Sequence, residues 1–217
     1  MTTLATALAI LAICTQSGCS LFVMAGKALF GDPEITAPFS RAANVDLRTG
    51  KHRVLIVAST PEAIKTEFPT TNTDLLERVN RHLKTAGVNV VNYNKVATWL
   101  DDNGGYWEDP NELAKAFDVE YIIHIDVSQF RLHDTSSPDL YQGYVAGAVY
   151  GYEVRTGDKG KAAHRIFNRA IEKEYPEGHP QLSDRMSRQS FHQEFLDRTG
   201  LHLAQLLYNF RTSDIEF

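Results

Sequence analysis

The residues most able to do chemistry in this sequence are a histidine and an aspartate two positions apart, His124 and Asp126. Alternate residues of a β-strand point to one face, so a strand over 119–132 would present both side chains together. An imidazole and a carboxylate can bind a divalent metal ion or move protons in hydrolysis. The pair can equally lie on a polar, solvated sheet face. We take the solvated face as the prediction and keep a hydrolase or metal-dependent enzyme as the alternative.

The common catalytic motifs are missing from the sequence. No G-x-G-x-x-G follows the first predicted strand, where a dinucleotide site needs it. G-x-S-x-G and H-E-x-x-H do not occur, and the Gly-Asp-Lys-Gly-Lys run at 157–161 lacks the spacing of a phosphate-binding loop. We therefore predict no catalytic residue, no metal site, no cofactor and no enzymatic activity.

Three aromatic residues surround a flexible glycine pair and are candidates for binding a partner. Trp99, Tyr106 and Trp107 flank Gly104 and Gly105 in a predicted loop. Tryptophan and tyrosine are frequent hot-spot residues of protein interfaces. The alternative is that Trp99 packs on the sheet and Trp107 covers the start of the next helix. The sequence leaves both roles open.

The N-terminus has the form of an export signal that ends at a lipidated cysteine. Residues 4–13 are an apolar stretch of the length of a signal-peptide core, and too short to span a membrane. Ser17-Gly18-Cys19 is similar to the end of a bacterial lipobox, although Gln16 and the uncharged first residues depart from the pattern. We predict a signal peptide over 1–18 and acylation of Cys19. Ordinary secretion and no export remain the alternatives.

An acylated Cys19 would set the location of the protein. Three acyl chains suffice for stable anchoring in a bilayer, and Ser20 after the cysteine favours an outer membrane facing the periplasm. Residues 19–50, which contain Pro33 and Pro38, are predicted to be a lipidated, extended tether. The net charge of −5 argues against nucleic acid as a partner. The expected partners are the lipid bilayer and an envelope protein, and the oligomeric state stays open.

Hydrophobic periodicity predicts a single α/β domain over residues 51–217. The order is β-α-β-α-β-β-β-α, a three-layer-like mixed sheet closed by an amphipathic C-terminal helix. The first strand is the apolar run 52–59, and residues 61–73 are expected to be a loop. The expected elements after it are a helix ending at Gly87, a strand over 88–93, a helical turn over 96–101, a helix from Pro110, a strand over 119–132, a hairpin of 141–156 with 161–176, and a helix over 191–210.

Three glycines recur every four residues on one face of the first hairpin strand. Gly143, Gly147 and Gly151 would let another backbone approach closely. We expect the final helix to pack there. Gly200 interrupts that helix, because glycine in a helix interior is less stable than alanine by about 1 kcal/mol.

Four segments together are similar to a known envelope domain. They read VLIVAS at 54–59, LLERVNRHLKTAG at 75–87, ELAKAFDVEYIIHIDV at 112–127 and YEVRTGDKG at 152–160. This pattern resembles the superfamily of the TolB N-terminal region, the curli secretion lipoprotein CsgG and the penicillin-binding-protein activator LpoB. The resemblance covers about residues 51–175, and His124 and Asp126 stand where that family usually has glycine.

The resemblance implies a function as well as a fold. It implies a membrane-anchored envelope lipoprotein that acts as a non-enzymatic protein-binding or assembly module. An envelope hydrolase or metal-dependent enzyme using the His124/Asp126 face is the first alternative. A component of an oligomeric secretion channel is the second.

Overall fold

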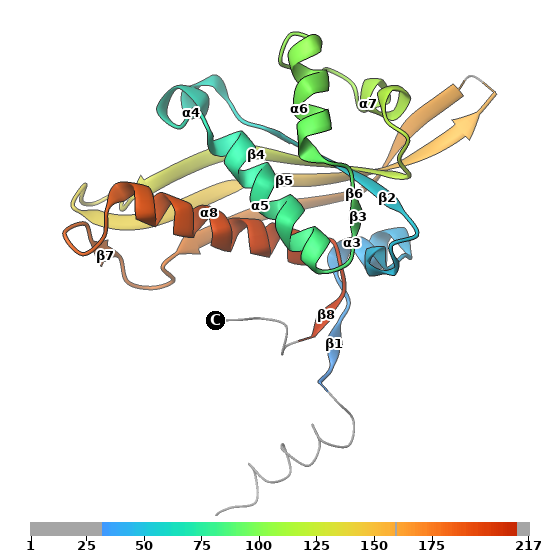
Figure 1. Cartoon of the computed structure of the whole chain (residues 1–217). Coiled ribbons are helices and arrows are strands. Elements are labelled where there is room, and N and C mark those ends of the chain that lie inside the picture. Colours follow the sequence, from blue (N-terminus) through green and yellow to red (C-terminus); the bar gives the residue numbers. More distant parts are fainter. Residues whose placement is uncertain (1–31, 159, 212–217) are drawn as a thin grey trace, which may run out of the picture. The chain divides into compact units, whose positions relative to one another are not determined.

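The computed structural model describes residues 32–158 and 160–211 and separates into two units (Figure 1). The smaller unit comprises residues 1–35 and 210–217. Its described part is a two-stranded antiparallel pair, β1 (Glu34–Ile35) with β8 (Phe210–Arg211). The larger unit, residues 36–209, carries the other described elements. No helix among the described residues is long and apolar enough to cross a membrane.

A six-stranded mixed sheet forms the centre of the larger unit. The strands are β2 (Arg53–Ser59), β3 (Asn89–Val90), β4 (Tyr121–His133), β5 (Leu140–Gly157), β6 (Gly160–Tyr175) and β7 (Gln181–Leu182). Their order is β3-β2-β4-β5-β6, with β7 paired to the start of β5. Strand β2 is parallel to both of its neighbours, and the remaining pairs are antiparallel. The apolar run of β2 fits this central place, because a parallel strand is covered on both faces.

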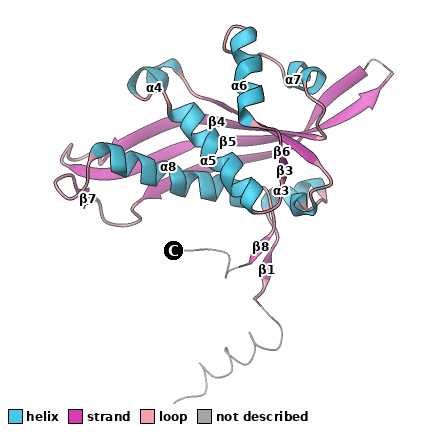
Figure 2. Ribbon diagram, viewed as in Figure 1, coloured by secondary structure: helices cyan, strands magenta, loops and turns pink. Residues whose placement is uncertain are grey.

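Helices cover both faces of the sheet, which confirms the predicted three-layer α/β arrangement (Figure 2). They are α3 (Pro38–Ala43), the 3₁₀ helix η1 (Leu47–Thr49), α4 (Glu62–Glu67), α5 (Thr71–Thr85), α6 (Tyr93–Asp102), α7 (Pro110–Ala116) and α8 (Arg188–Gln205). Helices α3, α5 and α8 lie on one face. On the other face, Val96 of α6 and Leu113 of α7 pack against Leu55, Val57 and Ile122.

Three stretches of the chain differ locally from the sequence prediction. The helix predicted over 191–210 is α8, which ends at Gln205, and Phe210 lies in β8. Residues 61–73 are not a continuous loop, because α4 begins after Pro61 and places Glu62 in its first turn. The predicted strand over 88–93 is cut to β3 because Asn92 caps a longer helix, α6, by accepting from the backbone N–H of Asn94 at 2.9 Å. The helix from Pro110 is confirmed, with Asp109 as its N-cap.

The folded unit also begins earlier than residue 51, within the predicted tether. Phe39 of α3 and Leu47 of η1 have 0% exposure. The Phe39 ring meets the rings of Tyr121 and Phe167 edge-on at 5.5 and 5.6 Å. Pro38 starts α3 rather than extending the chain, since the first helical position needs no N–H donor. The cysteine at position 19 lies outside the described residues.

The three glycines of β5 make three different close approaches. A Cβ on Gly143 would meet the ring of Phe195 of α8 at 2.5 Å, so the final helix packs there as predicted. A Cβ on Gly151 would instead meet Phe39 of α3 at 2.7 Å. A Cβ on Gly147 would lie 2.0 Å from the backbone oxygen of Asp126, where the β4–β5 register shifts. The three glycines therefore leave room for Phe39 of α3 and Phe195 of α8 against β5, and for the irregular strand pairing beside Asp126.

Candidate functional site

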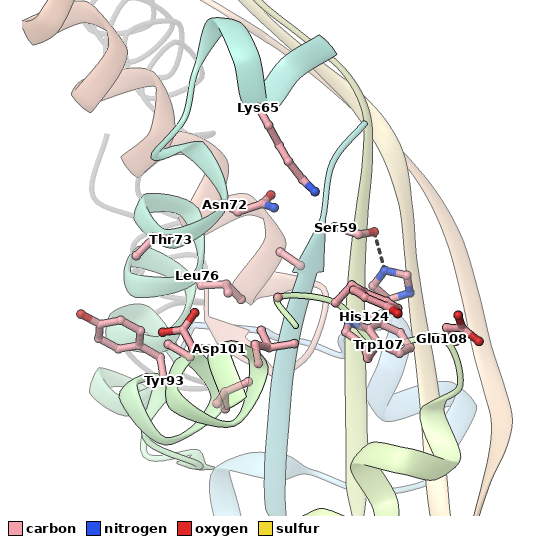
Figure 3. Close-up of a pocket in the computed structure, with 16 residues that line it drawn as sticks. Ser59, Lys65, Asn72, Thr73, Leu76, Tyr93, Asp101, Trp107, Glu108 and His124 are labelled. Atoms are coloured by element: carbon pink, nitrogen blue, oxygen red, sulfur yellow. Dashed lines mark hydrogen bonds between the residues drawn. The ribbon is translucent and has the colours of Figure 1, made fainter. Parts of the chain in front are cut away.

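A pocket of about 370 Å³ opens at the carboxyl end of β2. The chain leaves β2 through α5 on one face of the sheet and returns to β4 through α6 and α7 on the other face. Strand order reverses at such a point, and open α/β sheets bind ligands in the crevice there. The walls come from the end of β2, helices α4, α5 and α6, and the loop that follows α6 (Figure 3).

A serine connects the His124/Asp126 pair at the inner wall of this pocket. The β2–β4 register places Ser59 directly opposite Asp126 and Val57 opposite His124. Ser59 Oγ lies 2.7 Å from His124 Nε2 and 2.9 Å from Asp126 Oδ1 (Figure 3). The strand alternation that joins His124 and Asp126 was predicted. Ser59 was missed, because the pairing of strands about 65 residues apart leaves no local signal in the sequence.

The hydrogen bonds fix the tautomer of the histidine. An ionised carboxylate only accepts, so the Ser59 hydroxyl donates its proton to Asp126. His124 Nε2 must then carry a hydrogen and donate it to Ser59 Oγ. In a hydrolytic triad the histidine stands between serine and carboxylate and accepts the serine proton. Here the serine stands in the middle, so Asp126 does not orient His124 and Nε2 has no free lone pair toward Ser59.

Two aromatic rings lie against the His124 imidazole, Trp107 from the pocket and Tyr150 from the neighbouring strand β5. The Trp107 ring meets it edge-on at a centroid distance of 4.7 Å, and the Tyr150 ring lies at 5.7 Å. Burial lowers the pKa of His124, and the nearby carboxylate of Asp126 offsets part of that effect. The imidazole is therefore neutral at neutral pH.

The described residues hold no cluster of three or more His, Cys, Asp or Glu side chains that could bind a metal ion. His124 and Asp126 offer two ligands at most, and both are already engaged by Ser59. A structural or catalytic zinc needs three or four protein ligands. The pair is better described as part of a hydrogen-bonded support for the pocket wall.

The three predicted aromatic residues take different places around the pocket and the apolar cluster beside it. Tyr106 and Trp107 both line the pocket, and Tyr106 is 62% exposed. Trp99 lies outside the lining and packs edge-on against Phe117 at 5.9 Å, over the apolar cluster beneath α6 and α7. The packing alternative thus describes Trp99, and the partly buried Trp107 packs against the same cluster while it lines the pocket. Partner binding by Tyr106 and Trp107 stays a prediction.

No family model and no curated protein matches this chain. Lipoprotein GNA1162 from Neisseria meningitidis is a similar solved structure, with 12% identity, 70% of this chain and 98% of that chain covered, and a TM-score of 0.40. The PelC dodecamer from Paraburkholderia phytofirmans is 12% identical in sequence. The match covers 81% of this chain and 96% of that chain, with a TM-score of 0.39. A minor lipoprotein from Acinetobacter baumannii is 12% identical in sequence. The match covers 72% of this chain and 90% of that chain, with a TM-score of 0.30. Similarities this low assign this chain neither a family nor a function.

Proposed function

We propose that this chain is a non-enzymatic binding module of the bacterial cell envelope. Acyl chains on Cys19 would hold it in the membrane, and the pocket rim formed by Tyr106 and Trp107 would bind an envelope protein. The observation that carries the proposal is the 62% exposure of Tyr106 beside Trp107 at the mouth of a pocket. The lipobox-like Ser17-Gly18-Cys19 supports the location.

The physical basis is the contrast between the rim and the wall behind it. A large aromatic side chain in water gains free energy when a partner covers it, and such anchors dominate the energetics of protein interfaces. The wall is pre-organised, because Ser59 ties β2 to β4 and His124 supports the Trp107 ring. A rim that does not reorganise on binding loses less entropy in the complex.

Photo-crosslinking in intact cells tests this proposal. A photoreactive phenylalanine replaces Tyr106 in one strain and Asp184 in a control strain. Asp184 is exposed, follows β7 and does not line the pocket. We expect a discrete protein adduct from position 106, lost when Trp107→Ala is added, and none from position 184. Equal adducts from both positions, or none from 106, would contradict the proposal.

A hydrolase with Ser59 as nucleophile is a second candidate. The observation in its favour is the 2.7 Å contact between Ser59 Oγ and His124 Nε2 at a pocket wall. Catalysis would require the Ser59 hydroxyl to leave Asp126 and donate to a deprotonated Nε2. An active-site-directed fluorophosphonate distinguishes the two functions. Labelling of the wild type that disappears in Ser59→Ala would favour the enzyme, whereas the binding module predicts equal, background labelling of both proteins.

A further inference from the structure

The pocket behind Tyr106 has a polar end and an apolar end. Lys65 of α4 and Asn72 of α5 extend into it from one side (Figure 3). Leu76, Val96 and the Trp107 ring belong to its apolar lining. Most small-molecule and peptide-anchor sites have this composition, with an apolar wall and a few polar groups that fix the orientation of the ligand.

The two polar side chains at that end are poorly satisfied by the protein itself. Lys65 Nζ has a 3.7 Å contact with Glu62, whose side chain is 84% exposed. Asn72 Oδ1 is buried without a hydrogen-bond partner among the described residues. A buried polar atom without a partner is destabilising, so a ligand that donates a hydrogen bond to this amide oxygen would gain binding free energy.

The charges in the pocket are arranged to favour an anion beside Lys65. The two lining carboxylates lie away from it, Asp101 beside Tyr93 and Glu108 beyond Trp107 (Figure 3). His124 is neutral because burial lowers its pKa. Lys65 is therefore the cation of the pocket, and an ammonium next to amide N–H donors suits a carboxylate.

We propose that this pocket binds the C-terminal residue of the partner protein. The free carboxylate would lie at Lys65, the peptide group of the last residue would pair with the Asn72 amide, and an apolar side chain would lie against Leu76, Val96 and Trp107. A volume of about 370 Å³ accommodates one or two residues, which suits a chain end better than a helix or a folded surface. The inference rests on the proposed function and adds the chemistry of the ligand.

Titration of the purified protein with small probes tests the inference. The probe is acetyl-Ala-Ala-Phe with a free carboxylate, followed by calorimetry and by the NMR signals of the Asn72 amide and the Trp107 indole. We expect saturable binding that shifts both signals. The same peptide with a C-terminal amide should bind about 10-fold more weakly or worse, because it lacks the charge-assisted hydrogen bond.

Two lysine variants test whether the ligand carboxylate binds at Lys65. Lys65→Gln should weaken binding of the free acid about 10-fold or more and leave the amide unchanged. Lys161→Gln is the matched control, since Lys161 pairs with Asp118 on the surface and does not line the pocket. Equal affinity for acid and amide, or an unchanged affinity in Lys65→Gln, would overturn the inference. Binding of 3-phenylpropionate as tight as that of the tripeptide would also overturn it, because the ligand would then be a small carboxylic acid.

The crosslink at position 106 separates this inference from the proposed function. If the adduct forms in cells in both the wild type and Lys65→Gln, the binding module stands and the C-terminal ligand is wrong. If the wild type forms no adduct, the proposed function itself fails. An adduct that Lys65→Gln removes and Lys161→Gln retains would support both.

Discussion

At the residue scale, the Ser59 hydroxyl is the group on which the pocket wall depends. It bonds His124 and Asp126 at 2.7 and 2.9 Å, and His124 in turn contacts the Trp107 ring. The shared face of His124 and Asp126 could be predicted from strand alternation. The third member could not, because it comes from β2 and joins the pair only through strand register.

Removing this hydroxyl should destabilise the fold. Ser59→Ala leaves the Asp126 carboxylate and the His124 N–H without their shared partner in a half-buried site, at about 1–3 kcal/mol of unfolding free energy. Ser128→Ala is the control, because that exposed hydroxyl makes a surface bond to the Ala146 carbonyl and should change stability by less than about 0.5 kcal/mol. Urea unfolding measures both, and equal effects would refute the role assigned to Ser59.

The stability of the protein should also fall in mild acid because of His124. Its pKa is below the ordinary value of 6.5 in the folded protein, chiefly through burial. The unfolded chain takes up a proton as the pH drops through 6.5 while the folded protein does not, so the free energy of unfolding is highest above that pH. It declines below it, by at most about 1.4 kcal/mol per pH unit for one histidine. His192 and His202 act in the same direction, since burial lowers both pKa values.

A variant that lacks only the His124 imidazole isolates this contribution. Urea unfolding at about pH 7.5 and about pH 5.5 should show a smaller loss of stability in His124→Gln than in the wild type, because glutamine has no charge to gain. The remaining loss reports on the other two buried histidines. An identical loss in both proteins would show that His124 has an ordinary pKa in the folded state.

At the element scale, the packing of α5 on α8 depends on a glycine that sequence propensity marks as unfavourable. A Cβ on Gly200 would lie 2.8 Å from the Cβ of Arg78. Periodicity predicted α8 and the helix end at Gly87 because the apolar spacing and the stop signal are local. Helix α4 was missed, and α6 was predicted only as a turn over 96–101, since both helices are short and owe their stability to tertiary packing.

Gly200→Ala tests whether that close approach decides the outcome. Helix propensity alone would favour alanine by about 1 kcal/mol. We expect instead a net destabilisation of about 1–2 kcal/mol, because the added methyl group forces the two helices apart. Gly157→Ala, with nothing within 4 Å of the added carbon, should be nearly neutral. A stabilised Gly200→Ala protein would mean that the helices are not in close contact.

At the scale of the whole molecule, the folded unit reaches further toward the N-terminus than composition indicates. Phe39 and Leu47 are fully buried, although the prolines and glycines around them suggested a tether. Burial by distant rings, such as those of Tyr121 and Phe167, leaves no mark on the local sequence. The three-layer class itself was predictable, because it follows from the order of apolar strands and amphipathic helices.

Acylation of Cys19 is a separate prediction, and it concerns how the whole molecule is held at the membrane. Protein extracted from membranes should have the mass of residues 19–217 plus a diacylglyceryl group, usually with a third acyl chain, and Cys19→Ala should lose both the lipid and the membrane association. Intact mass spectrometry measures this. An unlipidated, full-length chain in the soluble fraction would contradict the anchor.

The most direct test of the binding pocket is a footprint of Tyr106 in the native envelope. Cys14 and Cys19 are the only cysteines of the chain, so Tyr106→Cys introduces a single new thiol into the folded unit, and Asp184→Cys gives a matched exposed control. The measurement is the maleimide labelling rate in isolated envelopes relative to the purified protein, with the unsubstituted chain as background. A partner that covers the pocket rim should slow labelling at 106 and leave labelling at 184 unchanged. Equal rates in envelopes and in pure protein at position 106 would contradict a binding surface there.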